Sequence, residues 1–201
     1  MGKSKIISSC VFVDWNNIRE SFTPAIGHNQ SAKIRKAIFK MQEQCAAILK
    51  SIDATSTYKV QTRFYDGWHR NDTPTSVFLE MQKAYYDWSS DRTIGRVYFQ
   101  SGPDYGNYLA CDSHRNPLIS TSRDSGQKMI DTSIACDFLY MLQNRQIEIG
   151  LIASDDDDFI PAALTAEAWG LKGYLIRSNG RGLEQVTKKS ANSPIKFWSQ
   201  N

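Results

Sequence analysis

The chain has 201 residues, 41% of them hydrophobic and 22% charged, which suits one sizeable hydrophobic core better than two domains. The 24 Lys and Arg against 21 Asp and Glu give a net charge of +3, too mild for a polybasic protein. The longest apolar runs, Ile6–Val13 and Ile147–Ala153, are much shorter than the roughly 18–20 residues that cross a bilayer. We therefore expect a single domain over residues 1–201, cytoplasmic and without a membrane partner.

The first half of the chain alternates extended apolar runs with helical patterns. Strands are expected at residues 6–13, 58–65 and 96–100. A helix is expected at 31–51, and a second one starts at Asp72-Thr73-Pro74 and continues to about residue 88. The helix at 31–51 has an apolar residue at every third or fourth position: Ile34, Ile38, Met41, Cys45 and Ile48.

The second half continues the alternation after an irregular insertion at 101–127, where a strand near 117–122 is expected. Helices are expected at 129–144 and 159–169, strands at 147–153 and 173–176, and a basic segment at 172–201. A strand, helix, strand order predicts an α/β fold with a central, mainly parallel sheet and helices on both faces.

Cysteine and histidine carry no recognisable chemistry in this sequence. The four Cys and three His are scattered, with no CxxC pair and no HExxH motif. This argues against a zinc site, a disulfide framework and a histidine-assisted nucleophile, and we expect four reduced thiols.

Acidic residues follow two of the expected strands. Asp14 comes directly after the first strand, and the four consecutive residues Asp155–Asp158 come directly after the strand at 147–153. Ligands of open α/β sheets bind at the carboxyl ends of the strands. Adjacent carboxylates repel one another unless a cation lies among them, and Mg²⁺ or Mn²⁺ is the kind of ion that carboxylates prefer. We expect Asp14, Asp156 and Asp158 to come within about 5 Å of one another.

A purely structural interpretation of these acids is also open. Asp residues at a helix start accept hydrogen bonds from free amides and are stabilised by the helix dipole, so the turn before Phe159 could be a cap. Asp14 favours a site, because the sequence shows no clear helix that it could cap. Asp131 and Asp137 on the helix at 129–144 point roughly 120° apart, so one of them can instead form a salt bridge.

Several segments resemble, in the same order, the motifs of NYN domains, PIN-like nucleases related to the LabA group. Val11–Ile18 resembles their hydrophobic-D-x-x-N opening, and Lys128–Asp131 followed by Asp137 is similar to their K-x-x-D helix segment. Ser154–Pro161 resembles their S-G-D-S-D-F-x-P turn, and Gly170–Tyr174 resembles the G-x-x-V strand that follows. These matches lie within residues 6–176, most of the chain.

The resemblance implies a carboxylate site that holds Mg²⁺ or Mn²⁺. It makes Asp14, Asp131, Asp156 and Asp158 the catalytic acids and metal ligands, with Asp137 as a further catalytic acid and Asn17, Lys128 and Ser154 in support. Two departures from the pattern add negative charge, because Asp155 and Asp157 stand where the family has Gly and Ser.

A nuclease also needs basic or aromatic surface near its acids to attract nucleic acid. The candidates are Trp68, His69, Arg70, Arg177, Arg181, Lys188 and Lys189. An ordinary solvated basic face and ordinary core aromatics are the alternatives.

The favoured hypothesis is therefore a metal-dependent endonuclease that acts on RNA more than on DNA. The alternative is a non-catalytic NYN-like module that binds RNA or protein; a homodimer is compatible with either. Phosphotransfer to an aspartate is less favoured, because no D-x-D-x-T motif begins at Asp14.

Overall fold

The computed structural model describes residues 5–22, 30–70, 73–86, 91–116, 129–177 and 193–197. The strands are β1 (Ile6–Asp14), β2 (Thr57–Tyr65), β3 (His69–Arg70), β4 (Thr73–Pro74), β5 (Arg92–Ile94), β6 (Val97–Phe99), β7 (Asp104–Tyr105), β8 (Ile149–Ala153), β9 (Lys172–Arg177) and β10 (Ile195–Phe197). The helices are α1 (Trp15–Phe22), α2 (Gln30–Ile52), α3 (Ser76–Tyr86), α4 (Ile130–Gln143), the 3₁₀ turn η1 (Asp157–Phe159) and α5 (Ile160–Ala168).

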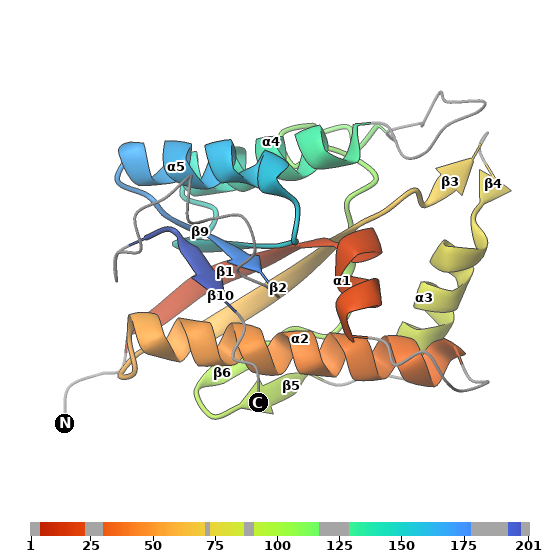
Figure 1. Cartoon of the computed structure of the whole chain (residues 1–201), viewed down its shortest axis with the longest axis horizontal. Coiled ribbons are helices and arrows are strands. Elements are labelled where there is room, and N and C mark those ends of the chain that lie inside the picture. Colours follow the sequence, from red (N-terminus) through yellow and green to blue (C-terminus); the bar gives the residue numbers. More distant parts are fainter. Residues whose placement is uncertain are drawn as a thin grey trace.

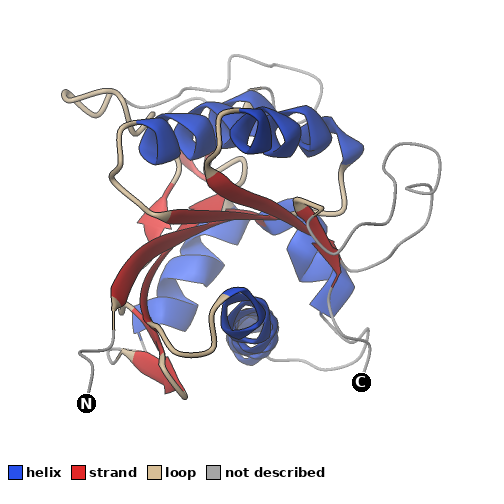
Figure 2. Ribbon diagram, turned by 90° about the vertical axis from the view of Figure 1, so that its left-hand side faces the viewer, coloured by secondary structure: helices blue, strands red, loops and turns tan. Residues whose placement is uncertain are grey.

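The central sheet runs in the order β10-β9-β8-β1-β2-β6-β5, with β7 beside β2. All pairings in this sheet are parallel except that of β5 with β6, and β3 pairs with β4 in a separate small ribbon. Helices α4 and α5 cover one face of the sheet, and α1 and α2 cover the other (Figures 1 and 2). The expected α/β fold with a mainly parallel sheet is confirmed.

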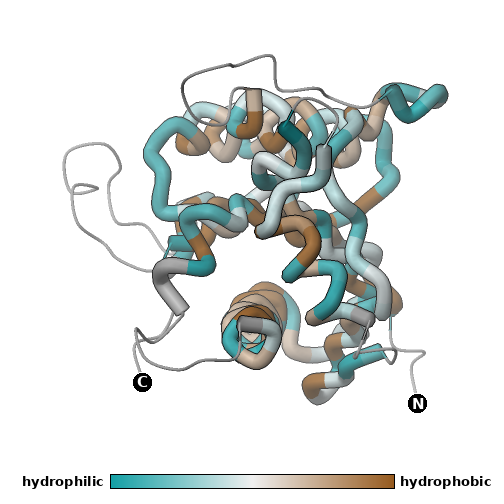
Figure 3. The backbone as a smooth tube through the Cα atoms, turned by 90° about the vertical axis from the view of Figure 1, so that its right-hand side faces the viewer, coloured by the Kyte–Doolittle hydropathy of each residue, from teal (hydrophilic) through white to brown (hydrophobic). Residues whose placement is uncertain are grey.

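Strand β1 is buried on both faces, which explains its continuous apolar sequence. Val11 and Val13 belong to the core layer that includes α2, whereas Cys10 and Phe12 belong to the layer under α4 and α5. Phe12 packs edge-on against Phe138 of α4, with ring centroids 5.7 Å apart. Figure 3 shows the matching distribution along the chain, with hydrophilic residues prominent in the outer loops and hydrophobic residues along the sheet and helices.

The long elements match their expected ranges closely, as do β6 and α5, whereas α3 begins at Ser76 because Thr73–Pro74 form β4 instead of the expected helix start. Helices α2 and α4 and strands β1, β2, β8 and β9 all lie within about three residues of prediction. Helix α1 was not expected: it is short, and Trp15, Ile18 and Phe22 are its apolar residues; Trp15 and Ile18 are buried. The strand expected near 117–122 lies outside the described residues.

The sheet topology changes direction between β1 and β8. From β1 the chain continues on one side to β2 and β6, whereas β8, β9 and β10 lie on the other side. Ligands of open α/β sheets bind at such a switch point, outside the carboxyl ends of the strands. None of the described helices is both long and apolar enough to cross a membrane.

Candidate metal centre

The ends of β1 and β8 bring Asp14 next to Ser154 at the switch point. Val13 pairs with Ala153, so the next residues of the two strands are neighbours. The Ser154 hydroxyl donates a 2.8 Å hydrogen bond to Oδ2 of Asp14, and Asn17 Nδ2 donates to the same oxygen at 2.5 Å. Asp14 is almost fully buried, and these two bonds fix its carboxylate in one orientation.

Asp14 also lies directly before α1, a helix that the sequence did not show. The Asn17 amide N–H donates to Oδ1 of Asp14 over a longer 3.4 Å, as at a helix N-cap. The argument that Asp14 has no helix to cap is therefore wrong. Asn17 and Ser154, the residues expected in support, both donate hydrogen bonds to the Asp14 carboxylate.

Local hydrogen bonds shape the acidic turn after β8. The Ser154 hydroxyl accepts from the Asp156 amide at 3.1 Å, and Oδ1 of Asp156 accepts from the Asp158 amide at 2.9 Å. Asp156 is thus the N-cap of η1, as the structural interpretation allowed. A side chain that caps with one oxygen still has a second oxygen for another ligand.

Three carboxylates converge at this turn. Asp131, in the first turn of α4, and Asp156 and Asp158 each offer an oxygen, and these oxygens lie within 4.8 Å of one another. The pKa of Asp131 is raised, first by its partial burial and then by the negative charges of Asp14, Asp156 and Asp158. The group of Asp131, Asp156 and Asp158, called here the carboxylate cluster, thus holds repulsion that a cation would relieve.

The membership of this cluster differs from the expected trio. Asp14, Asp156 and Asp158 were expected to meet within about 5 Å, but it is Asp131 that joins Asp156 and Asp158. Asp14 lies beside them, linked to the turn through Ser154 and electrostatically coupled to Asp131.

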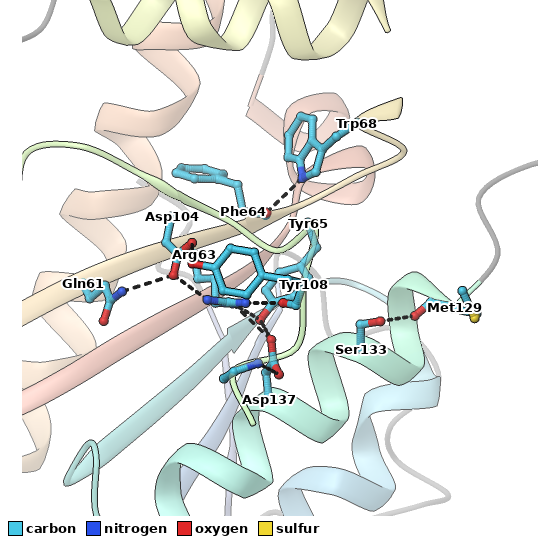
Figure 4. A network of polar contacts seen from close by, with 11 residues as sticks. Gln61, Arg63, Phe64, Tyr65, Trp68, Asp104, Tyr108, Met129, Ser133 and Asp137 are labelled. Atoms are coloured by element: carbon cyan, nitrogen blue, oxygen red, sulfur yellow. Dashed lines mark hydrogen bonds and ion pairs between the residues drawn. The ribbon is translucent and has the colours of Figure 1, made fainter. Parts of the chain in front are cut away.

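Asp137 is placed away from the cluster, in the core between α4 and β2. Figure 4 shows its carboxylate pointing to Arg63 and Tyr65. Its Oδ2 accepts from Arg63 Nε at 3.1 Å and from the Tyr65 hydroxyl at 2.7 Å, and Oδ1 accepts from the Ala110 amide at 2.6 Å. Asp137 is therefore the salt-bridge residue of the two helix acids, and we leave it out of the catalytic group.

Arg63 is the centre of this buried network, and the sequence reasoning missed it. The guanidinium also forms an ion pair with Asp104 and donates to the carbonyl of Tyr108 (Figure 4). Burial raises the pKa of Tyr65 well above its usual value, so its hydroxyl stays protonated and donates to Asp137. Arg63 continues an alternation of polar residues with Lys59 and Gln61 in β2, so the local pattern did not indicate that Arg63 is buried.

Of the nucleic-acid contacts expected near β3, one residue is buried and two are at least partly exposed. Trp68 is a core residue, 2% exposed, whose indole N–H donates to the carbonyl of Phe64 at 3.2 Å. A buried indole cannot stack on a base, so we leave Trp68 out of the proposed surface. His69 is partly buried against Phe78, with ring centroids 5.0 Å apart, and Arg70 is exposed.

Of the other basic candidates, one residue is buried and the rest lie outside the described residues. Arg177 is only 4% exposed and forms an ion pair with Asp157, so its guanidinium is engaged inside the protein. We therefore leave it out of the nucleic-acid surface. Lys128, Arg181, Lys188 and Lys189 lie outside the described residues.

Comparison with known proteins identifies a similar fold but no function. No family model matches the chain, and no curated protein matches it significantly. One solved structure that it resembles is VPA0982 of Vibrio parahaemolyticus, a protein of unknown function, with a TM-score of 0.51 and 13% sequence identity. The match covers 100% of this chain and 96% of the other. The protein is thus a single α/β domain whose carboxylate cluster could hold a metal ion.

Proposed function

We propose that this protein is a metal-dependent endonuclease of the NYN, PIN-like kind that hydrolyses phosphodiester bonds, in RNA rather than in DNA. The observation that carries the proposal is the convergence of Asp131, Asp156 and Asp158 within 4.8 Å at the sheet's switch point. The ordered sequence resemblance to NYN motifs and the mainly parallel sheet support the same class.

The residues present suit a hard divalent cation. Three carboxylate oxygens form the kind of ligand set that Mg²⁺ or Mn²⁺ prefers. The pKa of Asp131 is raised first by its partial burial and then by the like charges of Asp14, Asp156 and Asp158. When bound, such an ion supplies charge neutralisation at the scissile phosphate, a lowered pKa for the attacking water and stabilisation of the leaving oxygen.

The protein's own side chains would bind the cation and position the attacking water. Asp131, Asp156 and Asp158 would hold the cation. Asp14 is fixed through Oδ2 by Asn17 and Ser154, and its Oδ1 accepts only the long 3.4 Å bond among the described residues. That oxygen is therefore suited to orient a water molecule and accept its proton. No side-chain nucleophile is needed for this chemistry.

Nucleic acid would need basic residues to approach this acidic site. Arg70 is exposed and His69 is partly exposed, and both lie just after β2. Together with Arg181, Lys188 and Lys189 they form the proposed contact residues. Basic side chains would counter the repulsion between the cluster and a phosphate backbone.

Cleavage of end-labelled single-stranded RNA and DNA tests the proposal. The wild-type chain should cut RNA faster than DNA in Mn²⁺ or Mg²⁺ and should cut neither in EDTA. Asp156→Asn should abolish cleavage, whereas Glu167→Gln, which changes an exposed acid on α5, should not. Full activity in Asp156→Asn would refute the assignment. RNA binding in EDTA without any cleavage in Mn²⁺ would instead support the non-catalytic module.

A further inference from the structure

The acidic turn contains more carboxylates than the cluster uses. Of the four consecutive residues Asp155–Asp158, two belong to the carboxylate cluster, and these are Asp156 and Asp158. Asp157 alternates with them and forms an ion pair with Arg177 instead. The turn is therefore divided between a side that faces Asp131 and a side that contacts Arg177.

Arg177 reaches the turn because it ends the neighbouring strand. It is the last residue of β9, which pairs with β8 in parallel, and the Ser154 amide donates to the carbonyl of Ile176 at 3.2 Å. One terminal nitrogen of Arg177 forms the ion pair with Asp157, and the other donates to the carbonyl of Asp155 at 2.5 Å.

These two contacts bracket Asp156. Asp155 and Asp157 are its chain neighbours on either side, so the guanidinium fork of Arg177 binds the backbone carbonyl before the ligand residue and the side-chain carboxylate after it. Arginine is suited to this because its donors are held in one rigid plane. Arg177 is only 4% exposed, whereas its partner Asp157 lies at the surface, so the arginine reaches the turn from the protein interior.

We propose that Arg177 is a positioning residue for the metal centre: it holds the turn so that Asp156 and Asp158 face Asp131. The inference rests on the proposed metal site. In the described part of the chain, Arg177 binds Asp157 and the Asp155 carbonyl, and it thereby leaves the carboxylates of Asp156 and Asp158 to the cation.

The sign of one measurement separates positioning from simple electrostatics. Arg177 carries a positive charge close to a cation site, so if it acted through charge alone, its removal would tighten cation binding. If it positions the turn, its removal loosens the ligand geometry and weakens binding. The two roles therefore predict opposite changes.

This measurement is a titration of Mn²⁺ into the metal-free chain. Binding is monitored by calorimetry or by the electron paramagnetic resonance of free Mn²⁺. Arg177→Met should raise the Kd for Mn²⁺ at least about tenfold. The matched control is Arg92→Met at the opposite edge of the sheet, where Arg92 also binds a carboxylate, Glu43, and a carbonyl, that of Phe39. This control should leave the Kd unchanged.

A second pair of variants keeps the test decisive if Arg177→Met does not fold. Asp157→Asn removes the exposed partner of Arg177, and Asp155→Asn removes the same charge from the turn but retains the carbonyl that Arg177 binds. Asp157→Asn should weaken Mn²⁺ binding more than Asp155→Asn does.

Unchanged or tighter Mn²⁺ binding by folded Arg177→Met overturns the positioning role, as does an equal effect of the two Asp variants. A wild-type chain that binds no Mn²⁺ overturns the metal site itself and the proposed function with it. The two failures are therefore distinguishable.

Discussion

Replacing Asp131 with Asn should stabilise the metal-free protein while it abolishes Mn²⁺ binding. The pKa of Asp131 is raised in the folded protein by burial and by the charges of Asp14, Asp156 and Asp158. A carboxyl whose pKa is raised on folding adds stability below its unfolded pKa, and this contribution is lost as the pH rises through its folded pKa. At neutral pH Asp131 is therefore charged in the native state and is repelled by the neighbouring carboxylates. The uncharged amide of Asn, which has a similar shape, removes this repulsion.

The expected gain is modest. Oxygens of Asp156 and Asp158 lie within 4.8 Å of an oxygen of Asp131, and unit charges at this separation repel by about 1 kcal/mol in water. The aqueous value applies because Asp131 is exposed, and salt reduces it further. Two such pairs leave a net gain of about 1 kcal/mol, which raises the Tm by about 2–4 °C in a chain of this size.

Thermal unfolding in EDTA at a series of pH values tests this reasoning. The gain from Asp131→Asn should be full at pH 7, shrink as the pH falls through the raised pKa, and vanish below the ordinary Asp value of about 3.9. Asp112→Asn is the control, because backbone hydrogen bonds from Asn116 and His114 lower the Asp112 pKa and its removal should give no gain. A lower Tm for Asp131→Asn at pH 7, or a gain independent of pH, would refute the account.

Three further outcomes are expected. Arg63→Met leaves the buried Asp137 without its ion pair and should lower the free energy of unfolding in urea by about 3–5 kcal/mol. The folded fraction should retain its Mn²⁺ affinity. A loss of stability below about 1 kcal/mol would contradict this expectation. Gly173→Ala would place a Cβ 2.5 Å from Cζ of Phe138 and should cost about 1–3 kcal/mol by the same assay, whereas an unchanged midpoint would show that the contact relaxes freely. Mn²⁺ at about 100 times its Kd should stabilise the wild-type chain by about 2.7 kcal/mol, or about 5–11 °C in Tm, and should not shift Asp156→Asn; equal shifts would place the ion elsewhere.

The long elements were predictable because their burial is periodic. The apolar spacing of Ile34, Ile38 and Met41 continues through α2, and each of these side chains is buried. Helix α1 has eight residues, and Trp15 and Ile18 are its buried apolar residues among those whose side chains are described. So short a pattern does not distinguish a helix from a loop. Strand β6 was expected, but β3, β4, β5 and β7 were not, because such short strands depend on pairing partners that local sequence does not identify.

The site was predictable in part, for a reason of topology. The strand-end rule brings Asp14 of β1 to the same sheet edge as the turn after β8, because these strands are parallel neighbours, and Ser154 links the two. It does not predict that Asp131 takes the place of Asp14 beside Asp156 and Asp158. The contribution of α4 depends on how that helix is rotated against the sheet. In the fold, Asp137 forms its ion pair with Arg63 in the core, whereas Asp131 joins Asp156 and Asp158 at the acidic turn.

Ion pairs between residues that are distant in the sequence could not be predicted from local sequence patterns. Arg177 stands in a basic stretch of the sequence and therefore looked like a phosphate-binding residue. In the fold, β9 ends beside the turn after β8, and Asp157 neutralises Arg177 there. Charge patterning along the chain does not show which opposite charges meet across a sheet edge.

The anomalous scattering of a crystal soaked in Mn²⁺ would test the central claim most directly. The account predicts a peak between Asp131, Asp156 and Asp158, roughly 2.0–2.6 Å from at least one oxygen of each. No peak at this position in a wild-type crystal at saturating Mn²⁺, or a peak bound by other residues, would contradict the assignment of this cluster as the metal centre.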